Sequence, residues 1–166
     1  MNYIALFNIL FFAAYWSIRF KNGVPPSLSA DFYRLKEKGK SHYFDVFFYV
    51  TGLSMWFYGI YDEHYSGYTL MLLAVAGIFL VVVPIAPFFK IAKVSTWHYI
   101  GATGAIVFGF WAITFEYWDN KIISLIPIAL FIVTVLIMKL KKVSNYTTWV
   151  ELSAAACIFT RLTIMK

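Results

Sequence analysis

The chain has 166 residues, of which 61% are hydrophobic, 21% are aromatic and only 13% are charged. Soluble domains carry about 25% charged residues, and a water-soluble fold of this length cannot bury so much apolar surface. The composition argues against a soluble domain and predicts an integral membrane protein. The formal net charge is +6, but the basic residues stand between apolar runs, so we expect membrane lipids and no nucleic acid as partners.

Six apolar runs, bounded by charged residues, Gly, Pro or Asn, predict an all-α polytopic transmembrane helix bundle. One span needs about 20 apolar residues, so six spans would occupy roughly 120 residues and leave short loops. Residues 1–166 are therefore expected to form a single transmembrane domain. The expected spans are Ile4 to Phe20, Tyr43 to Tyr61, Tyr68 to Phe89, Trp97 to Tyr117, Ile122 to Leu140 and Thr147 to Met165.

Two features of the terminal runs qualify this reading. No Lys or Arg precedes the first run, so it lacks the basic region of a cleavable signal peptide and is expected to be a retained helix. Glu151 and Arg161 interrupt the last run, which leaves an alternative of five spans and one interfacial helix.

Cys157 is the only cysteine, which excludes an intrachain disulfide.

The distribution of basic residues predicts the orientation. The first loop carries six Lys or Arg, the third carries two and the fifth carries three, so eleven of the fourteen fall on one face of a six-helix bundle. Cytoplasmic loops collect Lys and Arg, so loops one, three and five are expected to be cytoplasmic and both termini outside. We expect the compartment to be a bacterial inner membrane.

The first loop, residues 21–42, predicts a short interfacial helix. Gly23 and the two prolines after Val24 end the first span, Ser27 or Ser29 can cap a new helix, and Asp31 falls in its first turn. On that helix Leu28, Phe32 and Leu35 are expected to face the membrane. Arg34, Lys36 and Lys38 are expected to contact anionic headgroups, and a substrate-gating loop is the alternative.

Three ionisable residues fall at one depth near the cytoplasmic ends of different spans, namely Asp45, His98 and Glu151. A charged side chain in hydrocarbon costs about 2.5 to 3.5 kcal/mol on insertion scales, so such groups are expected to face inward and to meet. His98 shares a helical face with Gly101, Ala105 and Gly109, and small residues mark helix contacts. Glu151 shares its face with Ala154 and Ala155.

The polar cluster of Asp45, His98 and Glu151 leaves three readings open. It could be a structural hydrogen-bond cluster, a site for a lipid headgroup, cation or proton, or a metal-dependent hydrolase site. Pro84 and Pro87 free the carbonyls of Leu80 and Val83, and an inward histidine or a water-filled pocket would serve them. No catalytic residue, bound metal or cofactor is predicted.

Two further polar features lie elsewhere. Glu116 and Arg161 approach the outer leaflet from different helices, where they are a candidate pair or else reach the interface independently. Asn8 is a lone amide in the first span and is expected to join helices rather than bind a ligand.

The segment Val24-Pro-Pro-Ser-Leu-Ser-Ala-Asp-Phe-Tyr33 after a first helix, with Trp97-His98 opening a later one, resembles short bacterial and phage multi-pass membrane proteins. These are distantly similar to the DRAM-type autophagy-modulator membrane family. The resemblance implies six helices with a Ser-containing first loop and implies no activity. Ceramidase-like hydrolases share a Ser, Asp and His constellation, but this sequence lacks their His-x-x-x-His pair and a seventh span.

The sequence thus favours a non-enzymatic integral membrane protein that binds lipid or a protein partner, as a sensor or an oligomeric membrane component. A homo-oligomer or a membrane partner is consistent with the small-residue faces. The alternatives are a small transporter or channel, and an intramembrane lipid hydrolase that uses the Asp/His/Glu cluster.

Overall fold

The fold is all-α in the part of the chain that the computed structural model describes, which is residues 3–61, 67–85, 94–116 and 121–164. Seven α-helices, one short 3-10 turn and no strand occur there, which confirms the predicted fold class. The elements are α1 (Tyr3–Arg19), η1 (Phe20–Asn22), α2 (Leu28–Glu37), α3 (His42–Tyr61), α4 (Gly67–Ile85), α5 (Val94–Phe115), α6 (Lys121–Leu140) and α7 (Tyr146–Ile164).

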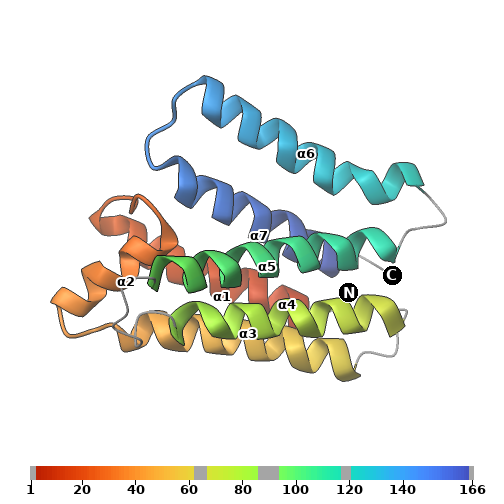
Figure 1. Cartoon of the computed structure of the whole chain (residues 1–166), viewed down its shortest axis with the longest axis horizontal. Coiled ribbons are helices and arrows are strands. Elements are labelled where there is room, and N and C mark those ends of the chain that lie inside the picture. Colours follow the sequence, from red (N-terminus) through yellow and green to blue (C-terminus); the bar gives the residue numbers. More distant parts are fainter. Residues whose placement is uncertain (1–2, 62–66, 86–93, 117–120, 165–166) are drawn as a thin grey trace.

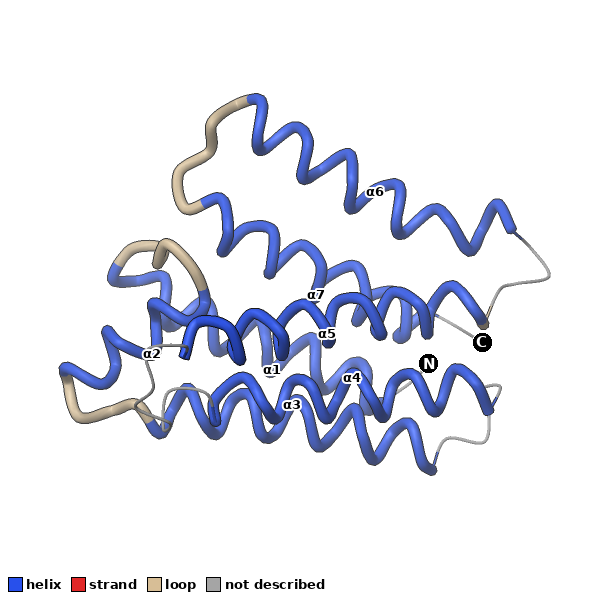
Figure 2. The backbone as a smooth tube through the Cα atoms, in the orientation of Figure 1, coloured by secondary structure: helices blue, strands red, loops and turns tan. Residues whose placement is uncertain are grey.

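The six long helices, α1 and α3 to α7, run roughly along one axis and alternate in direction (Figure 1). The start of α1 and the end of α7 lie at one end of the bundle, whereas α2 and the loop from α6 to α7 lie at the other (Figures 1 and 2). We call the end of the bundle that holds α2 and the loop from α6 to α7 the α2 end. The long helices correspond to the six expected runs to within a few residues; the last part of the third run, residues 86–89, lies outside the described residues.

Two of the described helical segments, Gly67–Ile85 and Trp97–Phe115, are long and apolar enough to cross a membrane by length and composition. Leu6–Arg19 and Leu125–Leu140 are apolar but shorter. The helical architecture is therefore established, while the crossing of a membrane by all six long helices stays a prediction.

Helix α4 packs extensively on α3 and α5 because glycines remove the side chains at the crossings. A Cβ on Gly52 of α3 would lie 2.7 Å from the Gly77 carbonyl oxygen of α4, and one on Gly77 would collide with the Gly52 carbonyl. On α5, a Cβ on Gly101 would lie 3.0 Å from the Phe79 carbonyl. Such close backbone approach is the property that small residues give to membrane helices.

The interior contains two apolar clusters at different heights. One lies toward the α2 end and contains Trp16, Phe32, Leu35, Phe44, Phe47, Phe48 and Val83. The other contains Met55, Leu72, Leu73, Ala76, Phe110, Ala112, Ile113, Ala154, Ile158, Phe159 and Leu162. Between α1 and α3 the Ser54 hydroxyl donates to the side-chain oxygen of Asn8 at 2.8 Å, which confirms the expectation that Asn8 joins helices.

The short helix α2 folds back onto the bundle. Its start is capped as predicted, because the Ser27 hydroxyl accepts from the backbone N–H of Ala30 at 3.2 Å. The expectation that Phe32 and Leu35 face the membrane is wrong: both are buried, 4% and 1% exposed, in the cluster at the α2 end. The apolar stripe was identified correctly, but it covers the interior of the bundle instead of lipid.

Helix α6 stands apart from the rest of the bundle (Figure 1) and packs only on α5 and α7 among the described elements. It carries many exposed apolar side chains, namely Leu125, Ile126, Leu130, Ile132, Val133, Leu136, Ile137 and Leu140, of which Ile126 and Leu130 line a groove toward α7. A patch of this kind marks a surface that contacts lipid or another protein.

The crossing of α3 and α4 gives a first prediction. Replacing Gly77 by Val should lower the free energy of unfolding in detergent by about 3 kcal/mol or more, and with it the unfolding temperature. A side chain at this position meets backbone atoms that cannot move aside. Gly67→Val on the same helix is the control, since a Cβ at Gly67 has nothing within 4 Å. Equal unfolding temperatures for the two variants would contradict this packing.

Candidate functional site

A small pocket opens between α1, α3, α4, α5 and α7, between the two apolar clusters. Its volume is about 70 Å³, several times the roughly 10 to 15 Å³ that one water molecule needs. Apolar side chains form most of its wall, and three polar side chains join them: Thr51, His98 and Glu151. The lining residues are Phe12, Phe47, Phe48, Thr51, Met55, Leu80, Val83, His98, Ala102, Ala105, Ile106, Glu151, Ala155, Ile158 and Phe159.

His98 occupies the first turns of α5 and is 5% exposed. Its imidazole lies near the backbone of Val83, in the last turn of α4. A carbonyl in the last turn of a helix has no partner within that helix. That an inward histidine or a water-filled pocket serves the Val83 carbonyl stays a prediction, with which the position of His98 agrees; Pro87 lies outside the described residues.

The second ring nitrogen of His98, Nε2, is buried and has no hydrogen-bond partner among the described residues. A protonated ring would place a second N–H donor there, and a buried donor without an acceptor is costly. The arrangement therefore suits a neutral imidazole.

Thr51 of α3 is the second polar group of the pocket and is 3% exposed. Its hydroxyl is buried and has no hydrogen-bond partner among the described residues, unlike Thr114, whose hydroxyl donates to the Phe110 carbonyl of its own helix at 2.7 Å. Thr51 can thus both donate to and accept from a group inside the pocket.

The three residues of the predicted cluster do not all reach this pocket. His98 and Glu151 line it, as expected from the small residues on their faces. Asp45 is absent from its lining, and its carboxylate interacts electrostatically with His42, in the same helical turn of α3, and with Tyr15 and Tyr49. Six residues separate Asp45 from Thr51, which is about 120° around a helix, so the face that carries Thr51 turns Asp45 away from the pocket.

A metal centre built from these residues is not supported by their positions. In the described residues no three His, Cys, Asp or Glu side chains lie close enough together to hold one ion. The hydrolase reading with Asp45, His98 and Glu151 around a metal therefore lacks the ligand set it needs.

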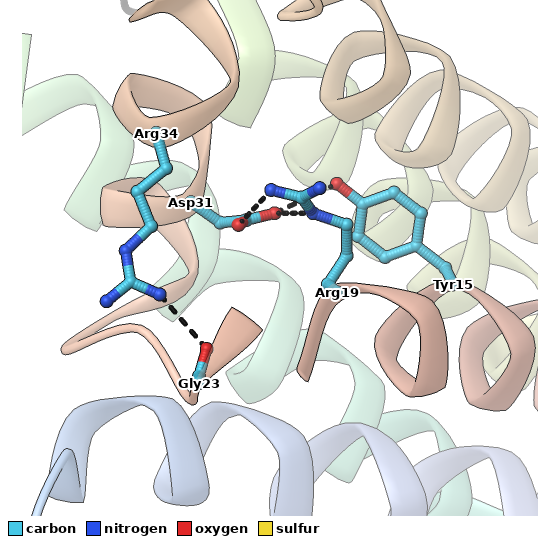
Figure 3. A network of polar contacts seen from close by, with 5 residues as sticks. All are labelled: Tyr15, Arg19, Gly23, Asp31 and Arg34. Atoms are coloured by element: carbon cyan, nitrogen blue, oxygen red, sulfur yellow. Dashed lines mark hydrogen bonds and ion pairs between the residues drawn. The ribbon is translucent and has the colours of Figure 1, made fainter. Parts of the chain in front are cut away.

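A second polar group lies at the α2 end (Figure 3). Arg19, the last residue of α1, donates from Nε and Nη2 to the two carboxylate oxygens of Asp31 on α2, at 2.8 and 2.7 Å. The Tyr15 hydroxyl donates to the same carboxylate at 3.3 Å. Asp31 is 1% exposed, so this two-bond pairing satisfies a carboxylate that burial would otherwise make costly.

Further bonds hold the same segment against α7 and the loop before it. Asn145 Nδ2 donates to the Val24 carbonyl at 3.0 Å, and the Thr148 hydroxyl donates to the Pro25 carbonyl at 2.6 Å. Arg34 Nη1 donates to the Gly23 carbonyl at 3.0 Å (Figure 3). We call residues 20–37 the cap, because they close the α2 end of the bundle through specific bonds.

The residues predicted to contact lipid headgroups divide into two kinds. Lys36 and Lys38 are exposed at the end of α2, whereas Arg34 is partly buried and bonded to Gly23. Headgroup contact by these residues stays a prediction.

The pair between Glu116 and Arg161 also stays a prediction. Glu116 follows α5, and Arg161 lies in the last turns of α7, beside an open groove of about 340 Å³ between α6 and α7.

Comparisons with protein-family models, with curated proteins and with solved structures give no match.

Sequence reasoning missed two features of the site. Thr51 was overlooked because it is uncharged, although it shares a helical face with Phe44, Phe48 and Met55 and so could have been assigned to the interior. The Arg19–Asp31 pair was overlooked because the two residues were assigned to a span end and to a helix dipole separately. The available signal was Gly23 followed by two prolines, since a turn there could bring the two residues together; in the structure Gly23 has φ +86°.

The buried pair gives a second prediction. Asp31→Leu should lower the free energy of unfolding in detergent by about 3 kcal/mol or more, because Arg19 is left without its carboxylate. Glu37→Leu, at an exposed position of the same helix, should change it by no more than about 0.5 kcal/mol. The double variant Arg19→Leu/Asp31→Leu should recover part of the loss, since it removes the unpaired charge. A double variant that is as unstable as the sum of both singles would contradict a direct pair.

Proposed function

We propose that this chain is a six-span integral membrane protein that is not an enzyme and that binds the polar end of an amphiphilic molecule in the pocket between its helices. The observation that carries the proposal is a pocket with mostly apolar walls into which two buried polar side chains, His98 and Thr51, present groups without a partner among the described residues. Ligand sites typically combine an apolar wall with a few placed polar groups.

The shape of the bundle supports the membrane part of this proposal. The six long helices contain 17 to 22 residues, which corresponds to about 25 to 33 Å of helix against a hydrocarbon core of about 30 Å. Large apolar side chains remain exposed on five of them, α1, α3, α4, α5 and α6, including Leu10, Leu53, Met71, Trp111 and Leu136. Such surfaces are unfavourable in water and are expected against lipid tails.

The charge distribution supports the orientation. Loops one and five, which carry nine of the fourteen Lys and Arg residues, meet at the α2 end (Figure 1). Cytoplasmic enrichment in Lys and Arg then assigns the α2 end to the cytoplasm and both termini to the outside. Lys36 and Lys38 would lie at the cytoplasmic headgroups, and each basic residue near an anionic surface contributes about 1 kcal/mol.

A channel is less well supported than a binding pocket. Beyond Met55 and Ile158 the interior toward the other end is filled by the apolar cluster that includes Leu73, Ala112 and Ile113, all essentially buried. A conducting path requires a continuous series of polar groups.

The topology is tested with reporters. A C-terminal fusion to a periplasmic phosphatase should be active, and a fusion to the same enzyme at Lys141, in the loop from α6 to α7, should be inactive. An inactive C-terminal fusion would overturn the six-span topology and favour five spans with an interfacial helix.

The pocket is tested by photolabelling. Membranes containing the protein are irradiated with a long-chain photoreactive amphiphile, and labelled peptides are identified by mass spectrometry. Ala105→Phe places a ring where a 7% exposed alanine lines the pocket, and it should reduce labelling of the pocket residues at least about tenfold, equivalent to ~1.4 kcal/mol. Ala13→Phe, at an exposed position on α1, is the matched control. Unchanged labelling in a folded Ala105→Phe protein would remove the pocket as a binding site.

A further inference from the structure

We infer that the pocket is coupled to the cap, so that a group bound in the pocket holds residues 20–37 more firmly on the α2 end of the bundle. The inference rests on the proposed function of the pocket and adds a consequence of binding. It follows from aromatic side chains that form part of the pocket wall and also support the cap, and it is independent of the chemistry of the polar end of the ligand.

Two rings of α3, Phe47 and Phe48, belong to both regions. Both line the pocket, and both are members of the apolar cluster that contains Phe32 and Leu35 of α2. They are 2% and 5% exposed. Since the interior of a protein is close-packed, neither ring can change position without affecting the side chains on its other side.

Two series of direct contacts lead from Phe47 to the cap. Tyr15 stacks on Phe47 with ring centroids 4.1 Å apart, and its hydroxyl donates to Asp31 of the cap at 3.3 Å. Trp16 lies between Phe47 and Phe20 of the cap, with centroid separations of 6.0 and 5.5 Å. The position of Phe47 therefore affects both η1 and the start of α2.

A third series begins at Phe48. Its ring centroid lies 4.6 Å from that of Phe44, which lies 5.6 Å from that of Phe32 in the cap. Aromatic pairs are favourable at centroid separations of about 4.5 to 7 Å. Three residues of the cap, Phe20, Asp31 and Phe32, are thus in contact with side chains that pack directly on the pocket wall.

The pocket gives these rings an alternative position. A ring that borders about 70 Å³ of space can turn into that space when no group fills it, and it then loses contact with the ring on its other side. A bound group occupies the space and removes the alternative. Because the alternative position also removes support from the cap, binding shifts the population toward the attached cap.

The experiment measures amide hydrogen exchange of the full-length protein in lipid nanodiscs, with and without the long-chain photoreactive amphiphile, which is kept in the dark. Exchange in residues 20–37 should become about twofold to tenfold slower, the effect of one aromatic pair. Exchange in α6, none of whose described residues lines the pocket, should not change. Irradiation of the same sample then reports whether the pocket was occupied.

Ala105→Phe tests the coupling without a ligand, because it places a ring of the protein itself in the pocket. It should slow exchange in the cap by a similar factor, and the amphiphile should add no further effect. Ala102→Leu, which also enlarges a side chain of the lining, replaces it if Ala105→Phe does not fold. Ala13→Phe, at an exposed position on α1, is the control and should leave exchange in the cap unchanged.

Phe47→Leu tests the route of the coupling. It should reduce the effect of the amphiphile on the cap at least about twofold, because two of the three series of contacts pass through Phe47. Phe110→Leu is the matched control, since Phe110 is a buried ring of the other apolar cluster, is absent from the pocket lining and packs on Phe131 of α6. Tyr15→Phe keeps the stacked ring and removes only the bond to Asp31, so it provides a milder test if Phe47→Leu does not fold.

The outcomes separate the inference from the proposed function. Pocket labelling without a change of cap exchange, in the wild-type protein and in Ala105→Phe, would overturn the coupling and leave the pocket as an amphiphile site. An equal effect of the amphiphile in Phe47→Leu and Phe110→Leu would overturn transmission through Phe47. Slower cap exchange in Ala105→Phe, together with absence of pocket labelling in the wild-type protein, would support the coupling and overturn the proposed function.

Discussion

The pairing of Arg19 with Asp31 is the constraint on which the arrangement at the α2 end depends. Both carboxylate oxygens of Asp31 accept from one guanidinium, and the carboxylate is almost completely buried. A buried carboxylate is tolerable only when it is paired and hydrogen-bonded, so α2 must fold back to the end of α1 for the charge to be compensated. That fold brings Phe32 and Leu35 into the interior, where they pack in one cluster with Phe44 and Val83.

Small residues determine where the pocket lies along the bundle. Gly52 against Gly77 and Gly101 against Phe79 bring α3, α4 and α5 together so closely that side chains cannot separate them. With α4 and α5 in this register, the end of α4 at Val83 and the start of α5 at His98 line the same pocket. Farther along, a Cβ on Gly109 would lie 2.6 Å from the Ile158 side chain of α7, so α5 also brings α7 and Glu151 to the same pocket.

The sequence was informative where a single helix carries its own pattern. Apolar runs located the six long helices, and Ser27 was identified as the N-terminal capping residue of α2. The small residues beside His98 and Glu151 predicted that both face inward. The pattern could not say what an apolar stripe meets: Phe32 and Leu35 suit a membrane surface and a protein interior equally. Asp45 was grouped with His98 and Glu151 from a predicted depth alone and does not line their pocket, because the rotation of α3 depends on its packing at Gly52 and Gly77, which belong to different helices.

The cap and the pocket share one aromatic wall. Tyr15, which donates to Asp31, stacks on Phe47 with ring centroids 4.1 Å apart and planes inclined by 17°. Phe47 in turn lines the pocket beside Thr51 and His98. Close-packed rings cannot shift singly without losing contact with their neighbours, so the position of Phe47 is determined jointly by the cap on one side and by the contents of the pocket on the other. Coupling between two sites is reciprocal in free energy, so any occupant that holds Phe47 in its stacked position stabilises the cap to the same extent that the intact cap strengthens its binding.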